Sequence, residues 1–392
     1  MIYLNQLGMV CPLGNTHGTI ARRMLDSAQP GLVMTDAYSP GRMLATGQVE
    51  LTLPPEVELP WPQRSRNNQI ALAALNDIKP SVTAAIERFG ASRIGVVVGT
   101  STSGIAEGEA ALRHYRDGGT LPEEFHYYQQ ELCSPALMLA EMLCVTGPAY
   151  VHSSACASSA KALASAARLI QMDVCDAVLA GGVDSLCGFT VAGFMALESV
   201  SAAPCNPLSA HRNGINIGEG AALFLMSREP ATVALRGWGE SSDGYHMSAP
   251  DPTGAGARLA MERALARAGV DAGEIDYINL HGTATIQNDA MEAQVIHSLF
   301  GAEVPVSSTK PFTGHALGAA SAIEAGLCWL AMQDNNRAGK LPPHLWDHAA
   351  DPALPALNVV EPGSSLGHPL RWALSNSFAF GGANAALVLG RE

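Results

Sequence analysis

Short apolar runs that end in turns rich in glycine and threonine recur along the chain. Arg93–Thr102 reads RIGVVVGTST, and Ile275–Thr285 reads IDYINLHGTAT. Runs of this length bounded by glycine favour buried strands over helices. A segment rich in glycine, alanine and serine follows each run, around Cys156 in the first case and after His315 in the second, and a further apolar strand comes next. This alternation predicts an α/β fold with parallel-type sheets covered by helices.

The order strand, turn, small-residue helix, strand, strand occurs twice. The last strands of the two series are closely similar, because Gly220–Glu229 reads GAALFLMSRE and Asn384–Glu392 reads NAALVLGRE. Any α/β chain alternates strands and helices, but matched AAL-x-L runs closed by Arg-Glu favour internal duplication. We therefore predict two halves, residues 1–229 and residues 230–392.

Three further stretches are expected to lie outside the alternating core. Leu53–Gln63 and Lys340–Leu370 are rich in proline, which predicts surface loops. Ala106–Ser134 is charged and aromatic, and we expect it to form an insertion over the core.

Composition narrows the class of protein. Of the 392 residues, 47% are hydrophobic and 15% are charged, so the chain can bury a large core and is not disordered. The net charge of −13 argues against a nucleic-acid binder, which is normally basic. Binding to an acidic partner would need a local basic patch against this unfavourable overall field.

The eight cysteines contain no Cys-x-x-Cys pair, so zinc and thioredoxin-type sites find no support. The N-terminus, MIYLNQLGMVCPLGN, lacks the charged region and the long apolar region of a secretion signal. No uninterrupted apolar run reaches about 18 residues, which predicts no membrane span. We expect a cytoplasmic protein with free thiols and no bound metal.

Cys156 is the cysteine best placed for chemistry. It lies in HSSACASSAKALASAARLI, where small polar residues predict the start of a helix. The positive end of the helix dipole would lower the pKa of the thiol and favour the thiolate, and free N–H groups of the first turn would stabilise an oxyanion. The alternative is a small buried cysteine that packs a tight helix, which explains the other seven cysteines well.

Two histidines of the second half complete the candidate site. His281 follows an apolar strand at its C-terminal edge, where α/β proteins place ligands. His315 begins the second small-residue helix, the position that Cys156 has in the first half. Either histidine alone is more often a core or capping residue than a catalytic one. Together with Cys156 they form a Cys/His/His set on matching elements, which points to one site between two helix N-termini.

Lys310 and Glu324 flank His315 among small apolar residues. A buried lysine needs an anionic partner, and Glu324 is the nearest candidate in sequence. The alternative is a lysine in a loop and a solvated glutamate on a helix.

Near the C-terminus, two glycines follow Phe380, so this loop can adopt backbone torsions closed to other residues and offer an N–H donor to an oxyanion. A simple tight turn between two strands is the alternative there.

Four segments together resemble the β-ketoacyl synthases of the thiolase superfamily, the elongating kind that act on acyl carrier proteins. They are SACASS, NLHGTAT with Asp289 and Glu292, STKPFTGHALGAASAIE and NSFAFGGAN, and they follow the family's order over nearly the whole chain. The resemblance implies a thiolase-like fold, in which duplicated halves form a layered αβαβα sandwich. SRNNQIALAAL, NGINIGEG and NSFAFGGAN are more similar to condensing enzymes of bacterial aryl polyene clusters than to housekeeping fatty-acid enzymes.

The resemblance implies a decarboxylative Claisen condensation of an acyl thioester with malonyl-[acyl carrier protein], in fatty acid, polyketide or aryl polyene chain elongation. Cys156 would be the nucleophile that accepts the acyl group. His281 and His315 would bind the malonyl thioester carbonyl and stabilise the enolate that forms on decarboxylation. Lys310, paired with Glu324, would hold the histidine geometry. This chemistry needs a thiolate and hydrogen-bond donors, and neither a metal nor a redox cofactor.

Further residues receive roles from the same resemblance. The N–H groups of Cys156 and Phe380 would form the oxyanion hole. The rings of Phe378 and Phe380 would line or gate the pocket. Thr283 and Thr285 would touch the phosphopantetheine arm that carries the substrate.

The chain departs from the family pattern in two places. Ala379 replaces the first glycine of the usual Gly-Phe-Gly-Gly loop, which predicts a loop with less hinge freedom. Asn213–Asn216 reads NGIN, where an Asp/Gly-Phe pattern is common.

The resemblance also implies an acidic acyl carrier protein as partner. Arg64 and Arg66 resemble the family's basic contact region, and Arg113 and Arg116 are further candidates. A scattered, solvated arginine is the alternative for each of these residues. Family members dimerise, so we expect a homodimer, or a heterodimer with a homologue of the chain-length-factor type that lacks the cysteine.

Other interpretations explain the same residues less well. Thiolases use a second cysteine, and CoA-primed initiating synthases use an asparagine, where this chain has His315. A non-catalytic partner subunit would lack the nucleophile, and Cys156 is present. A cysteine hydrolase would need an orienting asparagine or aspartate, and no local signature for one is present. Within the family, the alternatives are a housekeeping fatty-acid synthase and a subunit that acts mainly with a chain-length-factor partner.

Overall fold

One large sheet runs through a computed structural model of the protein, which describes residues 1–392. Its 11 strands have the order β11-β10-β9-β12-β13-β8-β1-β7-β6-β4-β5. The N-terminal part of the chain supplies β1 (Ile2–Val10), β4 (Ile94–Gly99), β5 (Ala149–His152), β6 (Ala177–Asp184) and β7 (Gly220–Ser227). The C-terminal part supplies β8 (Val233–Ser242), β9 (Tyr277–Asn279), β10 (Pro305–Ser307), β11 (Asn358–Val359), β12 (Trp372–Phe378) and β13 (Ala383–Arg391). A separate hairpin pairs β2 (Leu32–Thr35) with β3 (Leu44–Gly47).

Both parts of the sheet follow the same strand order. From the outer edge inward, the first part is β5-β4-β6-β7-β1 and the second is β10-β9-β12-β13-β8, with β11 outside β10. The directions match as well, because β4 and β9 are each parallel to both neighbours, whereas β6–β7 and β12–β13 are antiparallel. This repeat is what internal duplication of the sequence predicts. The division at residue 229 stays a prediction, and it falls in the connection between β7 and β8.

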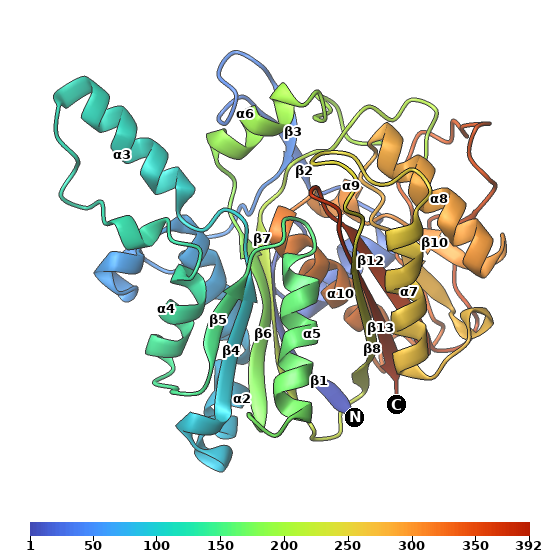
Figure 1. The fold of residues 1–392 in the computed structure, drawn as a ribbon, viewed down its shortest axis with the longest axis horizontal. Coiled ribbons are helices and arrows are strands. Elements are labelled where there is room, and N and C mark those ends of the chain that lie inside the picture. Colours follow the sequence, from blue (N-terminus) through green and yellow to red (C-terminus); the bar gives the residue numbers. More distant parts are fainter.

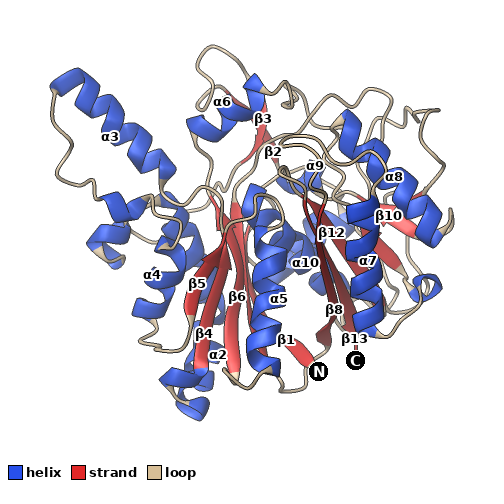
Figure 2. Cartoon of the chain, in the orientation of Figure 1, coloured by secondary structure: helices blue, strands red, loops and turns tan.

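Helices form three layers around the two parts of the sheet (Figures 1 and 2). α2 (Arg66–Phe89) and α4 (Ser134–Met142) cover the outer face of the first part, and α7 (Ala255–Ala268) and α8 (Ile286–Phe300) cover that of the second. α5 (Ser158–Gln171) and α10 (Ala320–Ala331) lie between the parts and contact strands of both. The predicted layered αβαβα sandwich is confirmed.

The remaining helices are short or peripheral: α1 (His17–Ala21), α3 (Ile105–Gly118), α6 (Gly188–Ala196) and α9 (Lys310–Thr313). Single turns of other helix types lie at Arg22–Asp26, Glu56–Glu58, Trp61–Gln63, Ala91–Arg93, Tyr127–Gln129, Ala272–Glu274 and Leu317–Ala319. None of the helices combines the length and the hydrophobicity needed to span a bilayer.

The core between the two parts of the sheet brings α5 and α10 together. The largest hydrophobic cluster has 48 buried residues, drawn from both helices and from strands of both parts. Small buried side chains such as Ala160 and Ala164 of α5 and Ala322 of α10 let the helices approach closely. Cys156 belongs to this cluster, so the candidate nucleophile lies in the interior between the halves.

The predicted insertion and one predicted surface loop differ in how much of each is buried. α3, which makes up the first part of the predicted insertion Ala106–Ser134, projects from the body in Figure 1 and does not lie over the core. Lys340–Leu370 is not wholly a surface loop, because residues 341–344 are buried. The His344 ring explains this burial, since its Nδ1 accepts the Ser308 N–H at 3.0 Å and its Nε2 donates to the Pro207 carbonyl at 2.9 Å.

Close packing of α7 on β8 depends on a glycine. A Cβ at Gly239 of β8 would lie inside the van der Waals radius of the Ala260 carbonyl oxygen of α7. We expect Gly239→Ala to destabilise the protein by about 2 kcal/mol or more, because the backbone of α7 must move. Gly273→Ala is the control, since nothing lies within 4 Å of the added carbon. Urea denaturation checks both variants, and equal stabilities would contradict this packing.

Candidate active site

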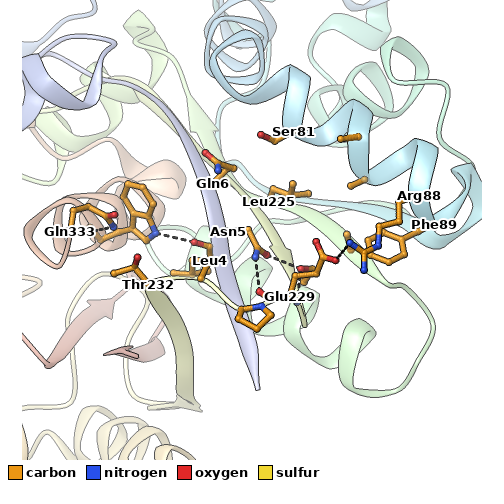
Figure 3. A pocket seen from close by; sticks show the side chains of 17 residues that line it. Leu4, Asn5, Gln6, Ser81, Arg88, Phe89, Leu225, Glu229, Thr232 and Gln333 are labelled. Atoms are coloured by element: carbon orange, nitrogen blue, oxygen red, sulfur yellow. Dashed lines mark hydrogen bonds and ion pairs between the residues drawn. The ribbon is translucent and has the colours of Figure 1, made fainter. Parts of the chain in front are cut away.

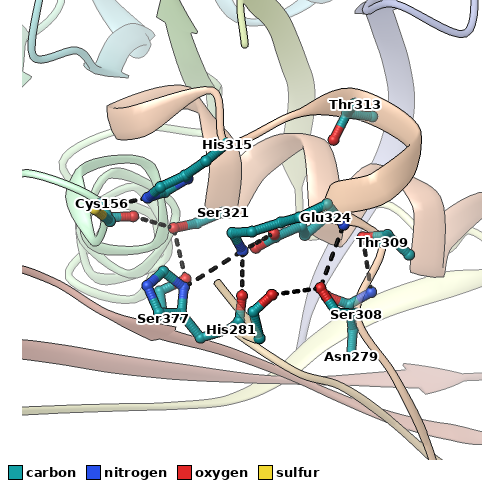
Figure 4. A network of polar contacts seen from close by, with 12 residues as sticks. Cys156, Asn279, His281, Ser308, Thr309, Thr313, His315, Ser321, Glu324 and Ser377 are labelled. Atoms are coloured by element: carbon teal, nitrogen blue, oxygen red, sulfur yellow. Dashed lines mark hydrogen bonds and ion pairs between the residues drawn. The ribbon is translucent and has the colours of Figure 1, made fainter. Parts of the chain in front are cut away.

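Cys156, His281 and His315 converge between the two halves (Figure 4). The Cys156 Sγ lies 2.9 Å from the His315 Nε2, and the two imidazole centroids are 5.4 Å apart. The sulfur and one nitrogen of each ring all lie within 4.8 Å of one another. All three side chains are buried. The structure thus places the predicted Cys/His/His set at one site, and the roles of its members stay predictions.

A strained turn between β5 and α5 presents the thiol. Ala155 has a φ of 46°, in the left-handed region that alanine rarely adopts. The Ser154 N–H donates to the Ser158 hydroxyl at 2.8 Å and closes the turn. The Ser321 hydroxyl of α10 donates to the Cys156 carbonyl at 2.8 Å. Because α5 begins at Ser158, the thiol stands just before the helix N-terminus and is held from both helices.

Burial controls the pKa of Cys156 more than the helix dipole does. Desolvation raises the pKa of this thiol to about 11, and the charge of Lys310 and the N–H groups of Phe380 and Cys156 lower it only in part. The prediction of a lowered pKa is therefore wrong, since a buried thiolate without an adjacent cation is disfavoured. The resting sulfur carries its proton at neutral pH.

Both imidazoles are neutral as well. Burial, followed by the charge of Lys310, holds the pKa of His281 and of His315 well below the usual value. Each ring therefore has one N–H donor and one unprotonated nitrogen. A neutral imidazole 2.9 Å from a neutral thiol can accept the thiol proton when the sulfur attacks.

The two histidines are held in different ways. The Glu292 carboxylate accepts the backbone N–H of His281 at 2.8 Å. The Lys310 ammonium lies 3.5 Å from the His281 Nδ1 and donates to the His281 carbonyl. In contrast, the His315 Nδ1 has no hydrogen-bond partner. The position of the His315 ring thus depends on its backbone and its packing.

Lys310 and Glu324 form a buried ion pair behind His281. The Lys310 Nζ lies 2.5 Å from the Glu324 Oε1, and the two side chains are 1% and 2% exposed. The alternative of a loop lysine and a solvated glutamate is therefore wrong. Burial raises the pKa of Glu324, and the Lys310 charge opposes this shift. Removing either partner would leave an uncompensated buried charge.

A small cavity of about 20 Å³ lies against the thiol. It has room for on the order of one water molecule. Its walls contain the predicted nucleophile, histidines, threonines and gate: Cys156, His281, Thr283, Thr285, His315, Phe378 and Phe380. Of the other wall residues, Ala379 belongs to the predicted terminal loop, and the sequence pattern did not assign Phe194, Ile215, Pro250 and Asn288 to the site. They come from loops, from α6 and, for Asn288, from α8, and no local pattern marks them.

A second cavity of about 410 Å³ lies on the other side of Phe380. The two cavities share Pro250, Thr285 and Phe380. The rings of Phe194 and Phe380 are 5.6 Å apart, and the Thr283 and Thr285 hydroxyls are hydrogen-bonded at 2.9 Å. Phe380 therefore separates the outer cavity from the thiol, which is the position expected for a gate.

In the terminal glycine loop, only glycines adopt the left-handed backbone conformation. Gly381 and Gly382 have φ values of 85° and 78°, whereas Ala379 has no positive φ. Alanine in place of the family's first glycine thus costs nothing in this conformation. The Phe380 N–H is directed at the Cys156 sulfur, as an oxyanion donor would be.

The four arginines proposed for docking differ in their surroundings. Arg66 donates to the fully buried Glu219 through its Nε at 2.9 Å and its Nη2 at 2.5 Å. A buried carboxylate thus already balances the charge of Arg66, and its role in docking stays a prediction. Arg64 is partly exposed, and Arg113 and Arg116 have side chains that are 63% and 78% exposed on α3.

A metal ion bound by Cys156 and His315 would need a wider spacing than the structure has. A tetrahedral zinc ion would separate a thiolate sulfur from an imidazole nitrogen by about 3.5 Å, given its usual bond lengths. The observed separation between Cys156 and His315 is 2.9 Å. The Lys310 ammonium close to the His281 ring would also repel a dication.

Sequence analysis missed a pair of serines beside the nucleophile. The Ser321 hydroxyl is hydrogen-bonded to the Ser377 hydroxyl at 2.7 Å and donates to the Cys156 carbonyl. Ser321 lies three residues before Glu324, so both side chains share one face of α10. That spacing is the signal that could have identified it. Ser377 carries no such signal.

The largest cavity, about 570 Å³, lies away from this chemistry (Figure 3). It contains none of the predicted site residues. Two of its polar side chains are bonded to the protein, because Asn5 donates to the Glu229 carbonyl at 2.7 Å and the Trp329 indole donates to the Leu4 carbonyl at 3.0 Å.

Comparison with known families gives two adjoining matches. Residues 69–231 match the N-terminal domain of β-ketoacyl synthases, and residues 232–345 match the C-terminal domain. Nodulation protein E of Rhizobium meliloti strain 1021 is 34% identical over 336 residues, which are 82% of each chain. A 3-oxoacyl-[acyl-carrier-protein] synthase 2 of Staphylococcus aureus is 30% identical over 343 residues, 82% of this chain and 83% of that protein.

Solved structures show the same relationship. The ketosynthase ApeO, in complex with its chain length factor ApeC from Xenorhabdus doucetiae, superimposes with a TM-score of 0.93. It is 44% identical and covers 100% of this chain and 98% of its own. A β-ketoacyl synthase from Burkholderia phymatum STM815 superimposes with a TM-score of 0.86 at 27% identity, covering 100% of this chain and 99% of its own.

The buried Glu292 carboxylate predicts a pH-dependent stability. Burial raises the pKa of Glu292 to about 7, from about 4.3 in an unfolded chain. The folded protein therefore keeps a proton that the unfolded chain releases, so the contribution of this group to stability is full below pH 4 and is lost as the pH rises to 7. Relative to Glu292→Gln, the wild type should lose up to about 1.4 kcal/mol per pH unit between pH 5 and 7. Urea denaturation measures this difference, with Glu262→Gln on the surface as control, and a constant difference would refute it.

The contact between Phe194 and Phe380 predicts that the Phe380 ring limits the access of reagents to the Cys156 thiol. Aromatic pairs of this kind contribute about 0.5–1.5 kcal/mol, so Phe194→Ala should speed alkylation of Cys156 roughly 2- to 10-fold by freeing the Phe380 ring. Phe189→Ala is the matched control, because Phe189 lies on the same helix and is 66% exposed. Mass spectrometry of iodoacetamide-treated protein measures the rate, and equal rates would show that this ring does not close the cavity.

Proposed function

The chain belongs to the β-ketoacyl synthase family, and from this premise we propose that it condenses an acyl group held on Cys156 with malonyl-[acyl carrier protein] in aryl polyene chain elongation. The protein is a condensing enzyme of the acyltransferase type. The observation that carries the proposal is the 2.9 Å contact between the Cys156 sulfur and the His315 Nε2, with His281 beside it.

The first proposed step transfers the acyl group to the enzyme. The Cys156 sulfur attacks the thioester carbonyl of the acyl carrier, and its proton passes to the His315 Nε2. The N–H groups of Cys156 and Phe380 stabilise the negative oxygen of the tetrahedral intermediate. When this intermediate collapses, the carrier thiol leaves and takes up the proton from His315. The neutral resting state of both groups makes this transfer necessary.

The second proposed step forms the carbon–carbon bond. Each neutral imidazole, His281 and His315, donates to the malonyl thioester oxygen in the tautomer whose N–H faces the substrate, and this oxygen gains charge as CO2 leaves. The resulting enolate carbon attacks the acyl carbonyl on Cys156, the carbon–sulfur bond breaks, and the β-ketoacyl product remains on its carrier. The released Cys156 thiolate takes up a proton from water and returns to the neutral thiol. Lys310 and Glu324 hold His281 in place for this step. The step uses the protein's hydrogen-bond donors and no metal or redox cofactor.

The size of the inner cavity supports a partner that helps to accommodate the growing chain. A space of about 20 Å³ cannot hold an extended acyl group, so the acyl chain must displace Phe194 or Phe380 or enter space that another subunit provides. ApeO and the ishigamide ketosynthase are both solved with a chain length factor. We therefore propose a heterodimer with a chain-length-factor-type homologue.

An acyl carrier protein is the proposed donor of both substrates. The outer cavity leads to Phe380 and is lined by Thr285, which suits a phosphopantetheine arm that reaches inward from the surface. Arg64, Arg113 and Arg116 remain the proposed basic contacts for an acidic carrier.

Product analysis with defined carriers tests this function. Acyl and malonyl carrier proteins should give a β-ketoacyl product by mass spectrometry, and Cys156→Ala should abolish it. Cys144→Ala, at an exposed cysteine, is the control and should keep full activity. His281→Ala and His315→Ala should each reduce condensation about 100-fold or more.

Two outcomes would change the assignment. Condensation by Cys156→Ala would reject the nucleophile and the proposed function. Full activity on saturated acyl chains without a partner subunit, and none on unsaturated or aryl primers with one, would assign the enzyme to housekeeping fatty-acid elongation instead.

A further inference from the structure

The backbone of His315 is hydrogen-bonded to the neighbouring segment Asn216–Gly218. The His315 N–H donates to the Asn216 carbonyl at 2.6 Å, and the Gly218 N–H donates to the His315 carbonyl at 2.9 Å. Two residues later, Leu317 has a φ of 48°, a left-handed conformation that costs on the order of 1 kcal/mol and persists only when neighbours enforce it. The His315 Nδ1 has no hydrogen-bond partner, so the ring is not held there directly. The ring can therefore keep its position only if the backbone on both sides of the histidine is held in place, which for the segment after it requires another contact.

Asp184 supplies that contact from the other half of the protein. It ends β6 and is fully buried. Its Oδ2 accepts the Gly318 N–H at 2.6 Å, directly after the strained Leu317. No other side chain is hydrogen-bonded to that N–H within 3 Å, so the carboxylate is its main acceptor.

The same carboxylate is also bound to the loop that follows β4. Six neutral donors surround it in total: Gly318 N at 2.6 Å, Thr100 Oγ1 at 2.6 Å, Ser101 Oγ at 2.6 Å, Ser101 N at 2.8 Å, Thr102 Oγ1 at 2.8 Å and Thr102 N at 2.9 Å. Hydrogen bonds to an ionised group are roughly twice as strong as neutral ones. Asp184 therefore connects the loop after β4, in the first half, to the backbone segment that follows His315.

The fit around this carboxylate leaves no space for adjustment. A Cβ at Gly318 would lie 2.8 Å from the Asp184 Oδ2 and 3.0 Å from the Ser101 N. A Cβ at Gly182 of β6 would lie 3.1 Å from the Ala319 Cα. The turn after His315 is thus seated directly on the ends of β4 and β6.

We propose that Asp184 is a positioning residue that holds His315 within reach of Cys156 by anchoring the turn after the histidine to the half that carries the nucleophile. Asp184 lines neither cavity of the site, so it touches no substrate and acts through His315. The inference rests on the proposed pairing of His315 with the Cys156 thiol.

Asp184→Asn tests the inference, because it keeps the shape of the side chain and turns one acceptor into a donor. The readout is the pH profile of Cys156 alkylation by iodoacetamide, followed by mass spectrometry. We expect the rate at pH 7–8 to fall about 10- to 100-fold and the profile to move to higher pH, since a displacement of about 1 Å costs that much when two groups must meet. For condensation, kcat should fall and KM should stay unchanged.

Asp176→Asn is the matched control. Asp176 lies directly before the other end of β6 and is bound to Arg93 at the surface. This control should keep the wild-type profile. Should Asp184→Asn fail to fold, Gly318→Ala is the second variant, since it displaces the same turn and leaves the carboxylate intact.

A double-mutant cycle separates positioning from general stability. In a His315→Ala background, Asp184→Asn should slow alkylation no further. A wild-type profile for folded Asp184→Asn and Gly318→Ala, or an equal further loss in the His315→Ala background, would overturn the inference. Condensation by Cys156→Ala would instead reject the proposed function, and the alkylation profiles would still decide the role of Asp184.

Discussion

The exclusion of water between α5 and α10 is the constraint on which the rest of the structure depends. These helices are lined by small side chains, so the turn that carries Cys156 and the segment that carries His315 meet in the interior. Burial there makes charge costly, and the thiol and both imidazoles rest in their neutral forms. The only ion pair within the site, Lys310–Glu324, compensates its own charges. Reactivity therefore comes from a proton moved during the reaction and not from a thiolate formed in advance.

Repetition in the sequence made most of the fold predictable. The two series of strands, and the small-residue helices after Cys156 and His315, follow from local patterns that survive in both halves. The Cys/His/His set was predictable for the same reason, because its members occupy related positions. The duplicated strand order also explains why strand ends of both halves reach one site.

The remaining features depend on partners far apart in the chain. The direction of the Cys156 pKa was predicted wrongly, because a local sequence shows a helix start but not the depth of burial. Arg66 is bound to Glu219, 153 residues away, and no spacing rule links them. His344 is buried in a proline-rich stretch because its ring accepts the backbone N–H of Ser308, which directly follows β10. Ala155 adopts a left-handed turn that alanine normally avoids, so only the assembled structure reveals it.

An experimental structure of the enzyme with an acyl group on Cys156 tests the central claim most directly. The account predicts a thioester at Cys156 whose carbonyl oxygen lies within hydrogen-bond distance, about 3 Å, of the N–H groups of Cys156 and Phe380. It also predicts that both imidazoles face the open side of that carbonyl. An acyl group on another cysteine, or a thioester oxygen turned away from these donors with either imidazole more than about 10 Å away, would contradict it.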